Sequence, residues 1–192
     1  HCLRGRVNLC IRNVAIGIHR DGGLAEFATL PAHRALPVGD LDPRHAAFAE
    51  PLACTLHGVD LGTPVPGERV LVIGGGVIGL LAVQLARNAG AEVTLLTRHP
   101  AKRALALRLG ARHTAATETE ARAALGAGAD LVLECAGVAE TVALSPRLAR
   151  SGGRVVVLGV MPKGETVAIE PFDLLFREIA LLHSFINPFT QG

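Results

Sequence analysis

A glycine-rich turn constrains this chain more than any other sequence feature. Gly74, Gly76 and Gly79 follow the apolar run 70–73 in the spacing G-x-G-x-x-G, and residues 77–88 continue with helical apolar spacing. This strand–turn–helix context is the one in which the motif binds a dinucleotide. Gly74 permits a tight turn, Gly76 lets the backbone approach a pyrophosphate, and Gly79 lets the helix pack closely on the strand. The free N–H groups of the helix N-terminus would face the phosphates. A glycine turn that binds nothing is the alternative.

Strand-like and helical segments alternate from residue 45 to residue 182. The expected strands are 70–73, 93–96, 112–115, 131–133, 154–158 and 179–182, and the expected helices are 45–61, 77–88, 101–109, 119–125, 139–149 and 172–176. This alternation predicts an α/β fold with a doubly wound, parallel, six-stranded sheet, as in Rossmann domains. The continuous apolar run Val155–Leu158 is typical of a strand buried on both faces. We therefore expect a dinucleotide-binding domain over residues 51–192.

Residues 1–50 follow a different pattern. Short apolar stretches such as Leu24–Leu30 lie between a Gly22-Gly23 turn and prolines at 31, 37 and 43. Apolar stretches bounded by turn residues predict strands joined by turns, so we expect a partial β-rich domain here. Because the chain begins with His1 and ends at Gly192 without a recognisable signal at either end, we expect it to be a fragment.

The composition excludes several classes of partner. Aromatic residues make up 3% of the chain, with no Trp or Tyr, so the core must be aliphatic. The net charge of +2 comes from scattered basic residues, which argues against a nucleic-acid surface. The uncharged stretch between Arg69 and Arg87 is interrupted by glycines, so we expect no membrane span. Four cysteines in a chain of this apolarity do not require disulfides, which favours a reduced, cytoplasmic protein.

The residue after the second predicted strand bears on the choice of cofactor. NAD-binding folds place an acidic residue there to hold the ribose 2′-hydroxyl. This chain has Thr97, followed by Arg98 and Lys102. Without a carboxylate, a 2′-phosphate is not repelled, and a guanidinium can pair with it through two hydrogen bonds. The sequence favours NADP over NAD, although Arg98 and Lys102 could instead be solvated loop charges.

Four short motifs stand out in the chain. Cys2 and Cys10 are separated by seven residues, and the other three motifs are D-G-G-L-A-E-F at 21–27, E-P-L-A-C-T-L-H at 50–57 and E-C-A-G at 134–137. Together they resemble the zinc-containing medium-chain dehydrogenases, and most closely their polyol and threonine dehydrogenase branches, where the spacing of Cys2 and Cys10 is that of the last two cysteines of the structural-zinc lobe. The resemblance implies that a GroES-like catalytic domain, of which residues 1–50 are a remnant, precedes the Rossmann domain.

The resemblance also implies metal ligands. Cys2 and Cys10 would be two of four structural-zinc ligands, with the other two upstream of His1. Glu50 would be the catalytic residue in this chain, either as a ligand of the catalytic zinc or as a group that holds zinc-bound water or relays protons. The alternative for Glu50 is an acid favoured by a helix N-terminus. His57, two turns further on, either faces the cofactor cleft or packs in the core.

The cofactor contacts implied by the resemblance lie at the ends of the predicted strands, where open α/β sheets bind ligands. They are Ile78, Thr97, Lys102, Leu158, Gly159, Val160, Ser184 and Phe185. Leu158 and Val160 could instead be ordinary core residues.

The function implied by the resemblance is zinc-dependent hydride transfer between a secondary alcohol or polyol and NAD or NADP. We expect the chain alone to turn over little, because the first catalytic zinc ligands would precede His1. One alternative is a zinc-free reductase of the same superfamily, such as a quinone reductase. The other is a non-catalytic nucleotide-binding module. The predicted strand 179–182 would be a sheet edge, which suggests a homodimer or homotetramer.

Overall fold

The computed structural model describes residues 1–188, except for the side chains of Cys2 and His33. The chain divides into two compact units. One is Pro51–Ile186, and the other is His1–Glu50 together with the segment from Asn187. None of the helices in the described residues has the length and apolarity needed to cross a bilayer.

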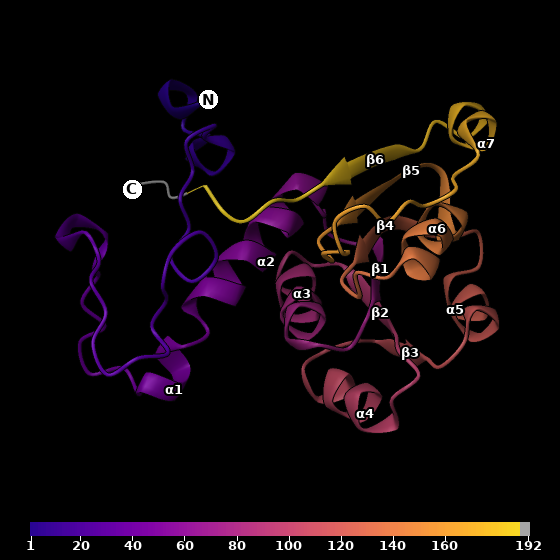
Figure 1. The fold of residues 1–192 in the computed structure, drawn as a ribbon. Helices are drawn as coiled ribbons and strands as arrows, with labels where there is room; N and C mark the ends of the chain where they lie inside the picture. Colours follow the sequence, from indigo (N-terminus) through magenta and orange to yellow (C-terminus); the bar gives the residue numbers. More distant parts are fainter. Residues whose placement is uncertain (189–192) are drawn as a thin grey trace. The chain divides into compact units, whose positions relative to one another are not determined.

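The larger unit contains a parallel sheet of six strands in the order β3-β2-β1-β4-β5-β6 (Figure 1). The strands are β1 Arg69–Ile73, β2 Glu92–Leu96, β3 His113–Ala115, β4 Ala129–Glu134, β5 Ala149–Val157 and β6 Ala180–His183. This order confirms the predicted doubly wound α/β sheet. The strand order reverses between β1 and β4, and ligands of such sheets bind in the crevice at the carboxyl ends of the strands beside that reversal.

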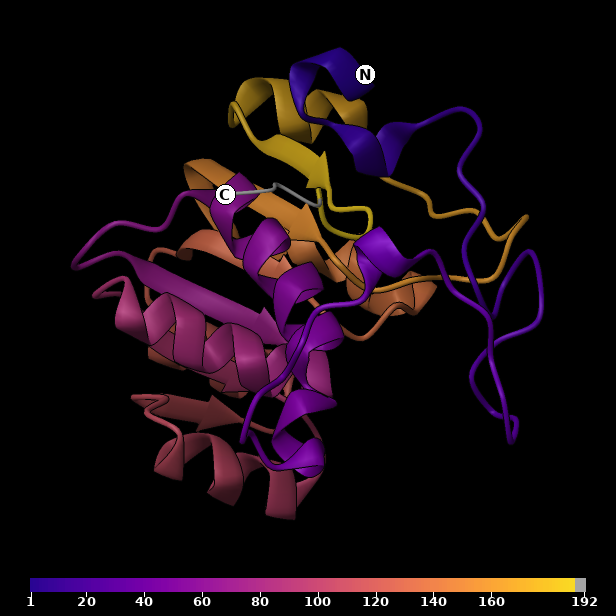
Figure 2. The ribbon, with the colours of Figure 1, turned by 90° about the vertical axis from the view of Figure 1, so that its left-hand side faces the viewer.

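Helices cover both faces of the sheet. The first face carries α2 Ala49–Gly62, α3 Val77–Asn88 and α4 Pro100–Arg108, and Figure 2 looks onto this face. The second face carries α5 Glu118–Leu125, α6 Ala139–Leu148 and α7 Pro171–Phe176. Each face has its own aliphatic core, and Val70, Leu71 and Val72 of β1 are completely buried between the two. The aliphatic core expected from the composition is therefore present as two layers.

One boundary differs from the sequence prediction. The helix expected over 139–149 ends at Leu148, and β5 begins at Ala149. Ala149 pairs with Ala129 of β4, and the register then shifts before Arg154 pairs with Leu131. Ser151, Gly152 and Gly153 thus lie within an irregular strand. Pairing with β4, which the local sequence does not reveal, determines this boundary.

The strands predicted in residues 1–50 are wrong. This region contains the short 3-10 helices η1 Cys2–Arg4, η2 Val7–Leu9 and η3 Ala32–Arg34, the helix α1 Pro43–Ala46 and one isolated bridge between Ile16 and Arg20. Residues 24–30 are irregular, and Leu24 and Phe27 are exposed. A strand needs a neighbouring strand to pair its backbone groups and a core to cover its apolar face. The described residues of this region provide neither.

Candidate dinucleotide site

The glycine turn after β1 has the geometry that its sequence predicts. Gly74 adopts a positive φ of 104°, and a Cβ there would come within 2.9 Å of the Ala136 backbone nitrogen. A Cβ at Gly79 would overlap the carbonyl oxygen of Gly74. Both positions therefore require glycine, the first for its backbone conformation and the second for the close approach of α3 to the turn.

Gly76, in contrast, lies beside open space. It precedes α3 with φ −75° and ψ −172°, a conformation open to any residue, and nothing lies within 4 Å of a Cβ built there. Among the described residues, no side chain caps the helix N-terminus at this point. Uncapped N–H groups at the positive end of a helix form an anion-binding site when the space in front of them is open. A dinucleotide pyrophosphate fits this arrangement, with Ile78 half-buried in the first turn of α3.

Thr97 and Lys102 lie against this turn. A Cβ at Gly75 would come within 2.9 Å of the Lys102 Cβ and 3.1 Å of the Thr97 Cγ2. Thr97 is buried at the carboxyl end of β2, whereas Arg98 and Lys102 are exposed, and their side chains make no hydrogen bond or ion pair with the described residues. The structure thus brings together three of the residues predicted to select the cofactor.

Arg103 is a cation that the sequence reasoning missed at this position. Its Nη1 donates to the Thr97 carbonyl oxygen over 2.9 Å. Residues 93–117 contain no Asp or Glu, so positive charge dominates the local sequence around the end of β2. Only the fold shows that the Arg103 side chain reaches back to the strand end.

Other predicted cofactor contacts lie near the ends of β5 and β6. Leu158 packs its side chain on α2, where a Cβ at Gly58 would overlap it, so this side chain belongs to the core. Val160 is 88% exposed beyond it. The Ser184 nitrogen donates to the Val157 carbonyl over 2.9 Å, and Phe185 is exposed. Leu158, Val160 and Ser184 lie at or just beyond the carboxyl ends of their strands.

Glu134, at the end of β4, is a second residue that the sequence reasoning did not select. Its side chain is completely buried, and its Oε1 accepts hydrogen bonds from the Ala136 and Gly137 nitrogens. Cys135 follows it as a free thiol. Burial and the nearby Glu134 raise the pKa of Cys135, so this thiol stays protonated and is unsuited to bind a metal as a thiolate.

The predicted zinc ligands do not form a metal site among the side chains that the structure describes, where no three His, Cys, Asp or Glu residues come together. Glu50 is exposed in the first turn of α2, and His57 is half-buried two turns further on. Cys10 is half-buried in the smaller unit, and the side chain of Cys2 lies outside the described residues. The residues present therefore do not fit a zinc ion by themselves.

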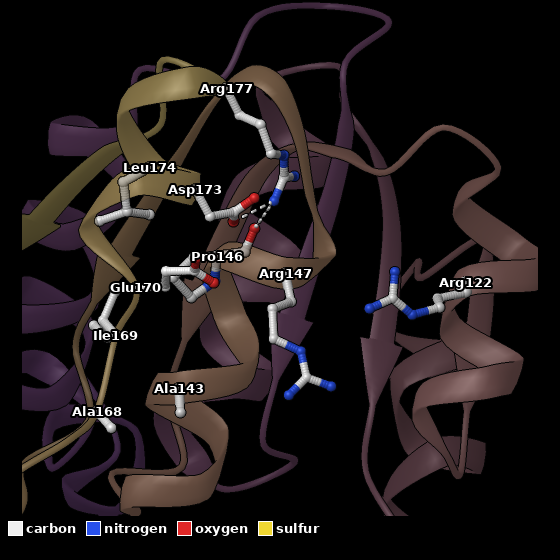
Figure 3. Close-up of a pocket in the computed structure, with 10 residues that line it drawn as sticks. All are labelled: Arg122, Ala143, Pro146, Arg147, Ala168, Ile169, Glu170, Asp173, Leu174 and Arg177. Atoms are coloured by element: carbon white, nitrogen blue, oxygen red, sulfur yellow. Dashed lines mark hydrogen bonds and ion pairs between the residues drawn. The ribbon is translucent and has the colours of Figure 1, made fainter.

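A cavity of about 450 Å³ lies between α5, α6 and the segment that leads into α7 (Figure 3). Its arginines are paired with acids. Arg177 bonds Asp173 at 3.0 Å, and Arg122 and Arg147 both pair with Glu118. None of the predicted cofactor contacts lines this cavity, so it is separate from the glycine turn.

Comparisons with known proteins identify the family. Residues 77–191 match the family model described as zinc-binding dehydrogenase. The chain is 37% identical over 176 residues to L-galactonate-5-dehydrogenase of Escherichia coli K12, covering 88% of this chain and 52% of that protein. The chain thus spans about half the length of the curated relatives it matches.

Two solved structures are also similar. One is a protein of Sinorhizobium meliloti 1021, described as a zinc-binding dehydrogenase and bound to NADP, with 56% identity and a TM-score of 0.89 over 98% of this chain and 58% of that one. The other is a short chain alcohol dehydrogenase of Escherichia coli CFT073 complexed with NADH, with 26% identity and a TM-score of 0.88 over 98% and 57%. The family match, the sheet order and the glycine turn lead to one conclusion: this chain belongs to the zinc-binding dehydrogenase family.

Proposed function

We propose that this chain carries the nicotinamide-dinucleotide domain of a zinc-dependent dehydrogenase that oxidises a secondary alcohol or polyol. The observation that carries the proposal is the uncapped N-terminus of α3 behind the open space at Gly76, beside the reversal of strand order. A bound dinucleotide would supply the hydride acceptor at its nicotinamide ring. The chain's own residues bind the pyrophosphate on backbone N–H groups and orient the two halves of the cofactor.

The substrate class rests on relatives. The name of the Escherichia coli relative gives a polyhydroxylated acid, L-galactonate, as its substrate and position 5 as the site of reaction. We extend the class of a polyhydroxylated secondary alcohol to the full-length protein. Cys2, Cys10 and Glu50 are proposed to serve its zinc sites, on the strength of the sequence motifs and the family match. The described residues by themselves do not assemble a set of zinc ligands.

For the cofactor we propose NADP rather than NAD. The end of β2 presents Thr97 in place of an acid, with the exposed cations Arg98 and Lys102 beside it. The relative with 56% identity is bound to NADP, and the one with 26% identity is complexed with NADH. Replacing Arg98 by alanine should lower the ratio of NADP to NAD affinity by about tenfold, since a charged hydrogen bond contributes about 1.5–3 kcal/mol. An unchanged ratio in calorimetric titrations would remove Arg98 from the argument.

We also propose that two copies pair through β6. It is the last strand in the sheet order, and Phe172, Leu175 and Phe176 of α7, which precedes it, are exposed. Unpaired strand edges bind other strands readily, and exposed apolar clusters mark protein interfaces. Sedimentation velocity should show a dimer for the chain and a monomer for Phe176→Glu; a monomer in both cases would refute the pairing.

Gly76→Ala tests the dinucleotide proposal. Alanine meets no atom and no backbone strain at this position, so the variant should fold normally. Its methyl group would occupy the space where the pyrophosphate must approach the backbone, so the affinity for NADP should fall by about tenfold or more. Gly23→Ala is a matched control, because its Cβ also meets nothing within 4 Å but lies in the smaller unit. Equal NADP affinity for the chain and Gly76→Ala would contradict the proposal.

A further inference from the structure

Glu134 is a fully buried carboxylate without a cationic partner in the described part of the chain. It ends β4, directly beside the point where the strand order reverses. Burying a carboxylate is costly unless hydrogen bonds replace its water. An apolar side chain would end a buried strand at lower cost, so the hydrogen bonds of Glu134 indicate what it does.

The side chain of Glu134 fixes the turn after β4. Its Oε1 accepts from the Ala136 nitrogen at 2.8 Å, the Gly137 nitrogen at 3.0 Å and the Thr141 hydroxyl at 2.7 Å. Two of these donors are in the turn, and the third is in the first turn of α6. The carboxylate therefore determines the position of the turn relative to both the strand and the following helix.

The same residue fixes the turn after β5. Its backbone carbonyl accepts from the Leu158 nitrogen at 2.8 Å and the Gly159 nitrogen at 3.0 Å. A Cβ at Gly159 would lie 2.5 Å from Glu134 Oε2 and would overlap the Gly137 nitrogen. The β5 turn thus rests directly on the carboxylate and on the β4 turn, and one residue holds both.

These two turns lie on one side of the phosphate-binding turn. The pyrophosphate site is at β1 and α3, and the adenosine end is expected at Thr97 on β2. The sheet order places β2 on one side of β1 and β4 and β5 on the other, so the second half of a bound dinucleotide extends over β4 and β5. A Cβ built on Gly74 would lie only 2.9 Å from the Ala136 nitrogen, so the β4 turn is the direct neighbour of the phosphate turn.

Building on the proposed function, we infer that Glu134 is a positioning residue for the nicotinamide half of the cofactor. It does not touch the adenosine end. It holds the β4 and β5 turns in the one arrangement that lines the nicotinamide half of the crevice. Loss of its charge should therefore weaken the complete dinucleotide and leave an adenosine fragment unaffected, which general destabilisation would not do.

Glu134→Gln tests this, with calorimetric titration of the 192-residue chain by NADP and by adenosine 2′,5′-bisphosphate. A neutral amide oxygen accepts the three hydrogen bonds more weakly than the carboxylate, and the amide NH2 group would face the Gly137 nitrogen, which also donates to Oε2 at 3.3 Å. NADP affinity should therefore fall by about tenfold, while the affinity for the bisphosphate stays within about twofold. Thr141→Val removes a single donor without changing the charge and should weaken NADP in the same direction by a smaller factor. If Glu134→Gln does not fold, Thr141→Val alone tests whether Glu134 positions the nicotinamide half of the crevice.

Ser145→Ala is the matched control. Ser145 is also completely buried on α6, but it donates to the Thr141 carbonyl within the helix and should leave both affinities unchanged. Equal weakening of both ligands by Glu134→Gln and Thr141→Val would assign Glu134 a purely structural role. Unchanged NADP affinity in both variants would also overturn the inference while leaving the proposed function intact. Failure of the unmodified chain to bind either ligand would overturn both.

Discussion

The two units of this chain have similar shares of apolar residues but differ in what those residues contact. In residues 51–186, apolar side chains of the strands pack with helix residues in two aliphatic layers, and most residues of β1 and β4 are buried between them. In residues 1–50, large apolar side chains such as Leu24, Phe27 and Leu36 are exposed, and Asn8 is the buried side chain among those described. Apolar composition alone therefore does not produce a core. Apolar side chains form a core only where paired strands and covering helices bring them together.

A core substitution should show the difference between the two units most clearly. Leu133→Ala removes a completely buried side chain of β4 and should lower the free energy of unfolding by about 2–5 kcal/mol. Leu24→Ala removes an exposed side chain of the smaller unit and should change it by less than about 0.5 kcal/mol. Urea unfolding followed by circular dichroism measures both, because the chain has no Trp or Tyr for fluorescence. Similar losses for the two variants would refute the difference between the units.

The two units also differ in how exposed their ion pairs are. Arg154 bonds both oxygens of Glu68 at 2.9 and 2.6 Å and donates to the carbonyl oxygens of Gly62 and Thr63, so it joins β5 to the end of α2. Its side chain is 20% exposed. Arg154→Ala should cost about 1–3 kcal/mol, because Glu68 and the helix carbonyls lose a partner.

The control for this prediction is Arg44→Ala in the smaller unit. Arg44 pairs with Asp42 at 2.7 Å, but its side chain is 89% exposed. Exposed pairs contribute little because water and salt screen them. We expect no measurable change in the urea midpoint, and a loss equal to that of Arg154→Ala would contradict this account.

Much of the larger unit follows from its sequence. The helix predicted at 77–88 has those bounds in α3, because Gly76 before it and Gly90 after it determine its ends locally. The strand predicted at 154–158 begins at Ala149 instead, because its start depends on a β4 partner far away in sequence.

The residues of the site also fall into those that local sequence predicts and those that only the fold reveals. The glycine turn and Thr97 were predicted from local motifs. Glu134 and Arg103 were missed, since their roles come from contacts with turns and strand ends that only the fold brings near. The strands predicted in 1–50 were wrong because an apolar stretch bounded by turns predicts a strand only where another strand can pair with it.

The smallest predicted effect concerns pH. The Arg154 guanidinium holds the pKa of Glu68 below its ordinary value of 4.5 in the folded chain. A carboxylate with a lowered folded-state pKa stabilises the fold above that ordinary value, and the contribution is lost as the pH falls through the folded-state pKa. The free energy of unfolding should therefore fall as the pH is lowered below about 4.5.

Glu68→Gln should make this decline shallower. In the smaller unit, Arg44 also lowers the pKa of Asp42, but that carboxyl is fully exposed. Asp42→Asn should therefore leave the decline in the free energy of unfolding unchanged at an ionic strength of about 0.15 M. Urea midpoints at a series of acidic pH values measure both. A decline that responds to Asp42→Asn and not to Glu68→Gln would reverse the assignment.

Hydrogen exchange with and without NADP tests most directly whether the turns of the larger unit bind the dinucleotide, because one experiment reports on both units. When NADP is added, amide exchange should become slower at residues 74–80, 97–103, 135–138 and 158–160. Exchange in residues 1–48 should not change. Protection confined to the smaller unit, or none in the turns at the carboxyl ends of β1, β2, β4 and β5, would contradict it.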